Sequence, residues 1–418
     1  MTRFSDDFFI RNEREAELAC YADRLAKKIE KTAGVYDETG TFPYEHFQLL
    51  KEEGYFKLTV PKKYGGEEIS LYEMLLVQER LAKGDGSTAL SAGWHLLTFM
   101  NVRQTRPWPE HVFEKLCRDA VEKGELINII NTERKIGNLA RGGKPSTIAK
   151  RTAGGYFISG RKAFASLAPI LNHFTIIAYL EDEDINAEFL VTKNEQVKVI
   201  ETWNSMGMRG TGSHDIEMKE VFVPDDALLT RLEPNQSDRF SADSRIYSLE
   251  IPAVYLGIAG AARDFALEFA DSTYSHSLGD YIKSAGHVRQ KIGEIELLLK
   301  SSRSILYSLA ERWERDPSLK EKLGNEVSMA KHIICNNAIK ITEIAMRIVG
   351  GSSLSRYHKL ERLFRDVQCG LFNPPHDDMV IEQLAASALA EVSDKKGKIQ
   401  EYFDQKEEIK LAHTGIDK

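Results

Sequence analysis

Residues 203–226 read WNSMGMRGTGSHDIEMKEVFVPDD, and this stretch decides the fold more than any other part of the chain. Three glycines within six residues permit a tight, irregular turn, and Arg209, Thr211 and Ser213 supply hydrogen-bond donors along it. The residues that follow alternate between apolar and polar side chains, which predicts a strand that ends in Val-Phe-Val-Pro at a domain edge. Taken alone, the stretch also fits a plain hairpin loop that is rich in glycine.

The chain on either side of this stretch divides into regions with different hydrophobic periods. From about residue 6 to 124, apolar residues return every three or four positions, as in amphipathic helices, and this period returns after about residue 243. Between them, short β-branched and aromatic runs separated by Gly, Asn, Asp and Pro predict an antiparallel sheet or barrel. We therefore predict an α+β, mostly α protein with an N-terminal helical domain (1–125), a middle antiparallel β domain (126–235) and a C-terminal four-helix bundle (236–418).

The composition argues against several classes of protein. The 418 residues carry a formal net charge of −7 without a concentrated basic segment, which disfavours nucleic acid as a partner. The four cysteines are scattered without CxxC spacing, so we expect no disulfide framework and no bound metal. The most apolar run, from Ile251, meets Arg263 well short of the roughly 20 residues that a membrane span needs. We expect a soluble, cytoplasmic protein that does not associate with membranes.

Residues 203–226 resemble the segment W…GMRGT.S followed by V-P in the acyl-CoA dehydrogenase superfamily. The resemblance extends from about Phe8 to Val392 and includes three further motifs in the same order. These motifs are INIINTERKIGNLARGGKPSTIA from Ile127, GGYFISGRKAFAS from Gly154 and MRIVGGSSLSRYHKLERLFRDV from Met346. The resemblance implies the fold of that superfamily, a bound FAD or FMN, and a homodimer or homotetramer.

The resemblance also implies which residues contact the flavin ring. Thr132 and Glu133 match a Thr-Glu pair that lies along the pyrimidine side of the ring. Phe164 and Ser166 occupy the places of a Trp and a Thr, so an aromatic ring would lie against the flavin and a hydroxyl would reach its N5 atom. Without the resemblance, Thr132 reads as an ordinary β-branched strand residue and Phe164 as an inward-facing strand residue.

The phosphate end of the cofactor matches the superfamily less well. The usual Pro-Gly-Ala-Gly-Ser is replaced by RKIGNLARGG, and Ser275 stands where the superfamily has an arginine that holds the FAD pyrophosphate. Loss of this bidentate partner should weaken the binding of a dinucleotide. We still expect Arg209 to contact the cofactor. Gly350 and Gly351 correspond to glycines that often contact the flavin of a neighbouring subunit.

The catalytic base of the classical dehydrogenases has no match here. Those enzymes remove an α-proton with a glutamate about eight residues after the Arg-Asp of the last motif, while hydride leaves to the flavin. The matching place holds Asn373 or Pro374, and neither accepts a proton. Asp377 and Asp378 follow, but helix capping gives them a structural explanation. Glu250, near the start of the first C-terminal helix, is a candidate for a relocated base.

These departures resemble another branch of the superfamily, the oxygenase components of two-component flavin monooxygenases of the dibenzothiophene monooxygenase type. Such proteins receive reduced flavin from a separate flavin reductase and need no α-proton base. This branch implies Ser166 and His376 as catalytic candidates, with Trp94, His95 and Asn373 around a small-molecule substrate. Two alternatives remain open: an acyl-CoA dehydrogenase with a relocated base, and a non-catalytic flavin-fold binding module.

Overall fold

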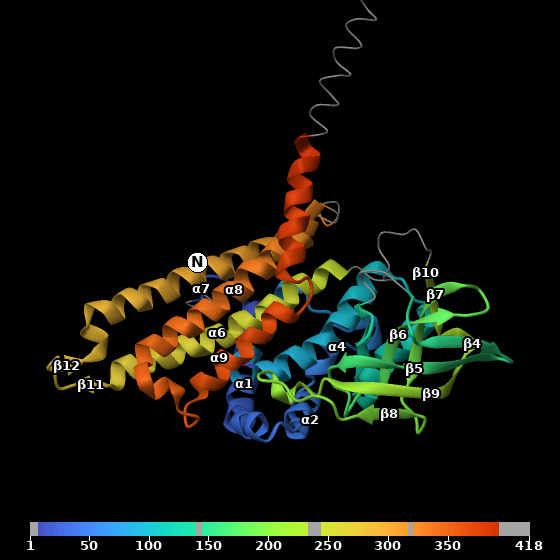
Figure 1. Cartoon of the computed structure of the whole chain (residues 1–418), viewed down its shortest axis with the longest axis horizontal. Helices are drawn as coiled ribbons and strands as arrows, with labels where there is room; N and C mark the ends of the chain where they lie inside the picture. Colours follow the sequence, from blue (N-terminus) through green and yellow to red (C-terminus); the bar gives the residue numbers. More distant parts are fainter. Residues whose placement is uncertain (1–6, 139–143, 233–243, 317–319, 321, 393–418) are drawn as a thin grey trace, which may run out of the picture.

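The computed structural model describes residues 7–138, 144–232, 244–316, 320 and 322–392. Along these residues the chain passes from helices through a sheet and back to helices. In Figure 1 the first helices occupy the centre, the sheet lies on one side of them, and the long helices of the last part lie on the other. This succession of a helical region, a sheet and a second helical region agrees with the order that the sequence predicts.

Two central helices bury almost all of their surface in the N-terminal part. Helices α3 and α4 do so because most of their side chains are apolar or small, whereas α1 is amphipathic. Buried apolar residues recur along α1 at Ala22, Leu25 and Ile29, and the helix ends at Gly40, which has a φ of 66°. The helices are α1 (Glu13–Thr39), α2 (Tyr44–Glu52), α3 (Leu71–Gly84), α4 (Gly86–Thr105) and α5 (Glu110–Arg118).

The middle part is a sheet in which the described strands follow the order β10-β7-β6-β4-β5-β9-β8, with β1 beside β6. Most neighbours are antiparallel, as predicted, but β1 and β4 each run parallel to β6. The long strands β5 and β9 pair with each other and carry candidate site residues at their ends. The strands are β1 (Ile127–Ile129), β4 (Ile148–Thr152), β5 (Gly155–Ala165), β6 (His173–Leu180), β7 (Ile185–Thr192), β8 (Val197–Ile200), β9 (His214–Pro224) and β10 (Leu228–Leu232), and β2 (Thr132–Glu133) pairs with β3 (Gly137–Asn138).

The C-terminal part is built around α6, which packs against α3, α4, α7, α8 and α9. A Cβ atom on Gly257 would lie 2.1 Å from the carbonyl oxygen of Glu79, so only glycine lets α6 approach α3 this closely. The fourth predicted helix, residues 377–392, projects from the body, and the short α9 packs on α6 and α8 (Figure 1). The labelled helices are α6 (Tyr247–Ser272), α7 (Gly286–Arg315), α8 (Gly324–Val349) and α9 (Lys359–Gln368). No described helix has the length and hydrophobicity that a bilayer crossing requires.

The loop before β9 joins all three parts of the chain, and we call this contact the three-way junction. The main-chain N–H of Met208 donates to the carboxylate of Asp366 in α9 at 2.6 Å. The neighbouring Arg365 donates to both carboxylate oxygens of Asp37 in α1, at 2.9 and 2.5 Å. Arg209 donates from Nε to the main-chain oxygen of Asp37 at 2.6 Å. The loop is thereby fixed to α1 and α9 at once.

A buried ion pair fixes the short strand β2 to the main sheet. Nζ of Lys162 in β5 donates to Oε1 of Glu133 and to the carbonyl oxygen of Ile177, each at 2.7 Å. Ser146 and Thr147 also donate to the Glu133 carboxylate. Burial alone would raise the pKa of Glu133, but the Lys162 ammonium and these hydrogen bonds outweigh it and lower that pKa to about 2. The pair is therefore ionised inside the protein.

Replacing Lys162 with Met is expected to lower the free energy of unfolding by about 3–5 kcal/mol, because the Glu133 carboxylate stays buried without its cation. Urea unfolding followed by circular dichroism measures the loss. Lys198→Met on the exposed side of β8 is the matched control, with an expected change below about 0.5 kcal/mol. Adding Glu133→Leu should restore most of the stability. A K162M protein as stable as the wild type would contradict this account.

Candidate active site

The end of β5 presents Phe164 on the outside of the sheet. The ladder between β5 and β9 shifts register between Lys162 and Ala165, and Phe164 adopts a φ of 56°. This bulge turns the ring outward, so 51% of Phe164 is exposed. Trp203 meets the ring edge-on, with centroids 6.3 Å apart and planes at 89°. Phe164 therefore offers a flat apolar surface to a planar ligand.

Three hydroxyl groups form a buried chain that begins two residues after Phe164. Oγ of Ser166 lies 2.9 Å from Oγ of Ser213, which lies 2.7 Å from Oγ1 of Thr211. Asn128 donates to the carbonyl oxygen of Ser166 at 3.0 Å and so positions it. Ser91 of α4 donates to the carbonyl oxygen of Thr211 at 3.1 Å. The chain connects the sheet to the helical core, and it can pass a proton because each hydroxyl both donates and accepts.

Two arginines meet on one buried carboxylate beside Phe164, and we call them the arginine pair. Asp215 accepts two hydrogen bonds from Arg134, each at 2.8 Å, one from Nε of Arg161 at 2.9 Å and one from Thr202 at 2.8 Å. The Arg134 guanidinium lies 5.4 Å from the centre of the Phe164 ring. Burial would raise the pKa of Asp215, but these hydrogen bonds outweigh it and lower that pKa. Two guanidinium groups against one carboxylate leave a surplus positive charge.

Helices α4 and α6 enclose the carboxyl group of Glu250. Its Oε1 accepts a hydrogen bond from Gln78 at 2.7 Å, while Oε2 is buried without a hydrogen-bond partner among the described residues. A Cβ atom on Gly93 would lie 2.0 Å from Oε1, so α4 leaves room for this carboxyl only because residue 93 is glycine. Burial raises the pKa of Glu250 to about 8, and the group is therefore protonated at neutral pH.

The predicted substrate residues Trp94 and Asn373 both adjoin helix α6. Trp94 directly follows Gly93, and its ring packs on Tyr247, one helical turn before Glu250, with centroids 5.7 Å apart. Oδ1 of Asn373 accepts a hydrogen bond at 2.6 Å from the hydroxyl of Tyr255. Glu250 therefore lies on α6 between Tyr247, which contacts Trp94, and Tyr255, which donates to Asn373.

His95 lies in the hydrophobic core, and its contact with a substrate stays a prediction. It is completely buried, its Nε2 is 2.9 Å from the carbonyl oxygen of Phe56, and its Nδ1 accepts from the N–H of Ile127 at 3.1 Å. These partners fix a neutral ring with its proton on Nε2, and burial lowers its pKa to about 4. Both ring nitrogens are thus engaged in protein contacts.

The polar groups of Glu133 and Arg209 also serve the fold. The carboxylate of Glu133 is used by the buried ion pair with Lys162 and not by a predicted cofactor contact. Arg209 donates to the main-chain oxygen of Asp37 in the three-way junction and, at 2.9 Å, to the carbonyl oxygen of Ser205. The carboxylate and the guanidinium therefore have structural roles, and their contacts with a cofactor stay predictions.

The other predicted positions are accessible. Thr132 in β2 and His376 after α9 are partly exposed. Gly350 and Gly351 lie exposed at the end of α8, and a Cβ atom on either would meet no atom within 4 Å. The local packing would therefore tolerate side chains at both glycines, although Gly350 has a φ of 69° that favours glycine.

Asp119, Glu125 and His173 place possible metal ligands within 4.8 Å of one another. Lys115 and Lys123 each approach Asp119 to 2.7 Å, and Glu125 lies 2.6 Å from Nε2 of His173. Because two ammonium groups already balance this cluster, it does not favour a metal cation.

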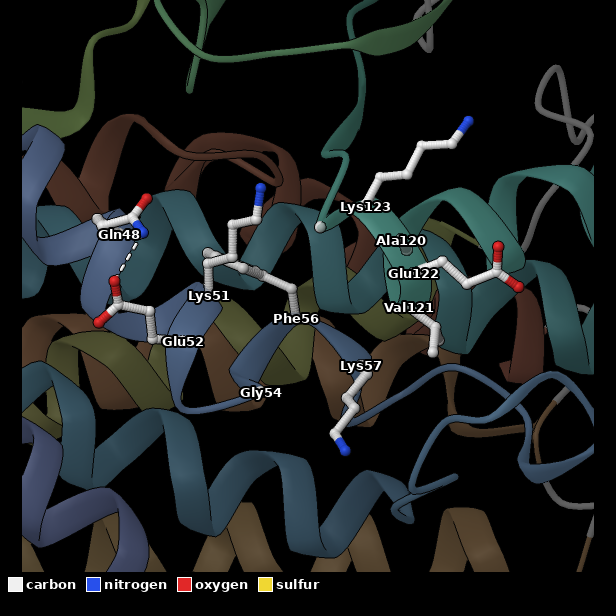
Figure 2. Close-up of a pocket in the computed structure, with 11 residues that line it drawn as sticks. Gln48, Lys51, Glu52, Gly54, Phe56, Lys57, Ala120, Val121, Glu122 and Lys123 are labelled. Carbon is white, nitrogen blue, oxygen red and sulfur yellow. Dashed lines mark hydrogen bonds between the residues drawn. The ribbon is translucent and has the colours of Figure 1, made fainter.

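A surface cleft of about 280 Å³ lies between α2 and the turn that follows α5 (Figure 2). Figure 2 shows that Lys51, Lys57 and Lys123 do not converge on one point, and that Gln48 donates to Glu52. The lining mixes both signs of charge and contains none of the predicted cofactor or substrate residues. The cleft is therefore separate from the candidate active site.

Family models cover most of the chain. Models of the acyl-CoA dehydrogenase N-terminal, middle and C-terminal domains match residues 12–105, 128–221 and 249–388. The chain belongs to the acyl-CoA dehydrogenase family. Members of this family are oxidoreductases, and the chain is therefore assigned as an enzyme of that class.

Similar proteins within the family differ in activity. A putative acyl-CoA dehydrogenase of Bacillus subtilis, YdbM, is 41% identical over 91% of this chain and 98% of its own length. The L-evernosamine nitrososynthase of a Micromonospora species is 27% identical over 87% of each chain. A solved structure of KijD3 with FMN and dTDP-3-amino-2,3,6-trideoxy-4-keto-3-methyl-D-glucose has a TM-score of 0.80 at 25% identity and covers 91% of this chain and 94% of its own.

Sequence reasoning missed the arginine pair, Asp215 and Asn128. Arg134 and Asp215 lie 81 positions apart, and no local pattern joins them. A usable signal was the acidic residue at the start of the strand that follows the glycine-rich turn, because a carboxylate at a strand end often binds a cation from its neighbour. Because the phosphate-binding residues of the family are altered in this chain, an arginine that pairs with Asp215 is a candidate for a cofactor contact.

Glu250→Gln is expected to change how stability depends on pH. The carboxyl has a pKa of about 8 in the folded protein against an ordinary value of 4.5, so between these values only the folded state holds the proton. Its contribution to stability therefore falls as pH rises through this window, by at most about 1.4 kcal/mol per pH unit. The glutamine variant lacks this fall and should gain stability relative to the wild type towards high pH.

Urea unfolding at about pH 5, 7 and 9 measures the effect, with Glu17→Gln on the exposed side of α1 as the control. The control should follow the wild type at every pH. Parallel curves for Glu250→Gln and the wild type would show that Glu250 is not buried as a neutral acid.

Proposed function

We propose that this protein is the oxygenase component of a two-component flavin monooxygenase. It takes reduced flavin, FMN or FAD, from a separate flavin reductase and transfers one oxygen atom of dioxygen to a small organic substrate. The observation that supports this most is that Asn373 or Pro374 stands where the dehydrogenases carry their glutamate; the side-chain oxygen of Asn373 accepts from Tyr255 at 2.6 Å. An amide accepts no proton, so α-proton abstraction has no base at this position.

The buried carboxyl of Glu250 suits a proton donor better than a base. With a pKa of about 8, it carries its proton at neutral pH. Transfer of one oxygen atom leaves the other atom of dioxygen to be released as water, which requires protons. His376, partly exposed three residues after Asn373, is the candidate for orienting the substrate.

The other residues of the site bind the flavin and limit the access of water. The exposed ring of Phe164 stacks on the flavin, and the hydroxyl of Ser166 donates to its reacting edge. The bound reduced flavin supplies the electrons that activate dioxygen. Trp94 and Tyr247 form apolar walls beside Glu250, and such walls limit unproductive loss of the activated oxygen to water.

Two of the similar proteins support an oxygenase. The name of L-evernosamine nitrososynthase denotes the formation of a nitroso group, in which oxygen is bonded to nitrogen. The KijD3 structure holds FMN together with an amino sugar nucleotide. Both similarities extend over nearly the whole chain, and we infer by analogy a flavin in this protein and a substrate with an oxidisable heteroatom or ring.

An acyl-CoA dehydrogenase that uses Glu250 as a relocated base is the second candidate. The 41% identity to a putative acyl-CoA dehydrogenase favours it, and so does the unpaired Oε2 of Glu250. In that case Glu250 must lose its proton before it acts, so activity would increase as pH rises towards about 8. Phe164 and Ser166 keep an aromatic ring and a hydroxyl at the places of the Trp and the Thr, which argues against a non-catalytic module. A homodimer or homotetramer remains a prediction.

A flavin titration distinguishes the two enzymes. We expect the purified protein to bind photoreduced FMN or FAD more tightly than the oxidised forms. Addition of oxygen to the reduced complex should produce a transient absorbance band before oxidised flavin appears. Tight binding of oxidised FAD, followed by bleaching with an acyl-CoA, would instead establish the dehydrogenase.

Ser166→Ala is expected to release more hydrogen peroxide per reduced flavin consumed, because the flavin loses a hydrogen bond. A bond worth about 1 kcal/mol corresponds to about a fivefold change in the partition between product and peroxide. A peroxide assay with photoreduced flavin measures this change. Ser304→Ala on the exposed side of α7 is the control. Equal peroxide release from Ser166→Ala and the wild type would remove Ser166 from the mechanism.

A further inference from the structure

We infer that the arginine pair, Arg134 and Arg161, anchors the terminal phosphate of FMN. This inference rests on the proposed binding of a flavin and deepens it by choosing between FMN and FAD. It assigns to the chain a phosphate site built on the buried carboxylate of Asp215, at the end of the sheet where Phe164 exposes its ring.

The charge balance of the pair favours an anion. The side chain of Asp215 is 0% exposed, and it accepts both oriented guanidinium groups. The nearby Glu217 pairs with Lys219 at 3.1 Å, so it does not cancel the surplus charge. A net charge of one therefore remains on the two arginines. Because Asp215 already holds their side chains in place, they lose little conformational entropy when they bind a ligand.

The geometry leaves donors free for that anion. Each arginine uses Nε and Nη2 towards Asp215, and Nη1 of neither has a hydrogen-bond partner among the described residues. The side chains of Arg134 and Arg161 are 49% and 44% exposed, so these N–H groups can reach a ligand from solvent. Guanidinium N–H groups match phosphate oxygens in geometry and form charge-assisted hydrogen bonds with them.

The position of the pair connects this phosphate to a flavin. The Arg134 guanidinium lies 5.4 Å from the centre of the Phe164 ring, which is half exposed. Because this guanidinium lies over the ring, a planar molecule would pack on the part of Phe164 that stays exposed, next to the arginine pair. A flavin has both the flat ring and the phosphate-bearing chain that such an arrangement requires.

The same chemistry favours FMN over FAD. The phosphate of FMN is a monoester with a charge of about −1.5 to −2 at neutral pH, whereas each phosphate of the FAD pyrophosphate has one ester and one anhydride bond and a single charge. Two cations on one carboxylate complement the more highly charged monoester best. At the position expected to hold the pyrophosphate of a dinucleotide, the chain has Ser275, whose hydroxyl pairs with Ser277 at 3.1 Å.

The test compares riboflavin, FMN and FAD, each oxidised and photoreduced, by fluorescence and calorimetric titration of the full chain. We expect the wild type to bind FMN at least about tenfold more tightly than riboflavin, in a manner weakened by salt and by inorganic phosphate. Arg134→Gln and Arg161→Gln should each weaken FMN binding about ten- to hundredfold, the range of a lost charge-assisted hydrogen bond. Riboflavin binding should change less than about twofold. Arg134→Lys keeps the positive charge but loses the two-point hydrogen bonding of the guanidinium. We therefore expect its FMN affinity to lie between those of the wild type and Arg134→Gln.

Arg231→Gln is the matched control. Arg231 is also 49% exposed and forms a two-point ion pair in the same sheet, with Glu183 at 2.7 and 2.9 Å. Its replacement should leave the affinities for all three flavins unchanged.

Three results would overturn the phosphate site. They are equal affinity of the wild type for riboflavin and FMN, equal weakening of both flavins in Arg134→Gln, and no binding of any flavin, which would refute flavin binding as well. If arginine-dependent FMN binding is found but acyl-CoA bleaches the flavin, or no oxygen transfer follows, the phosphate site stands and the proposed oxygenase function fails.

Discussion

The hydrogen bond from the main chain of Met208 to Asp366 holds the three parts of the molecule in one arrangement. The bond requires close approach, since a Cβ atom on Gly207 would lie 2.4 Å from the carbonyl oxygen of Arg365. Arg365 continues the contact to Asp37, so one loop is fixed to the first and the last helical regions together. Because the loop before β9 is bonded to both α1 and α9, its position is fixed relative to both helices. The position of β9, which follows it, is fixed as well.

The candidate active site depends on this constraint because its groups follow the loop directly. Thr211 and Ser213 lie at the end of the loop, and Asp215 lies in the second position of β9. The hydroxyl chain continues to Ser166, directly after the neighbouring strand β5, while Ser91 of α4 secures it from the helical side. The hydroxyl chain and the arginine pair are therefore assembled from several segments of the middle β domain, and the helical region secures the hydroxyl chain through Ser91.

The sequence predicted those parts of the molecule that depend on local order. Hydrophobic periods predicted the succession of helices, sheet and helices, and the motif residues led to Phe164, which is half exposed and whose role against a flavin ring stays a prediction. The sequence could not predict which side chains form hydrogen bonds or ion pairs with residues that are distant in the sequence. His95 has its ring between Phe56 and Ile127, and Arg134 meets Asp215 across 81 positions. Burial and pairing of this kind arise only when the chain has folded.

The contrast between two buried glutamates explains why Glu250 is a neutral acid whereas Glu133 is ionised. Glu133 and Glu250 have almost the same exposure, 2% and 0%. The ammonium of Lys162 lowers the pKa of Glu133 to about 2, whereas Glu250 has only the amide of Gln78 against the cost of burial and has a pKa of about 8. Burial alone thus gives a neutral acid, and a base needs a cation beside it. Among the described residues, Asn373 supplies no carboxylate and Glu250 has no cation beside it, so the Glu250 carboxyl carries its proton at neutral pH.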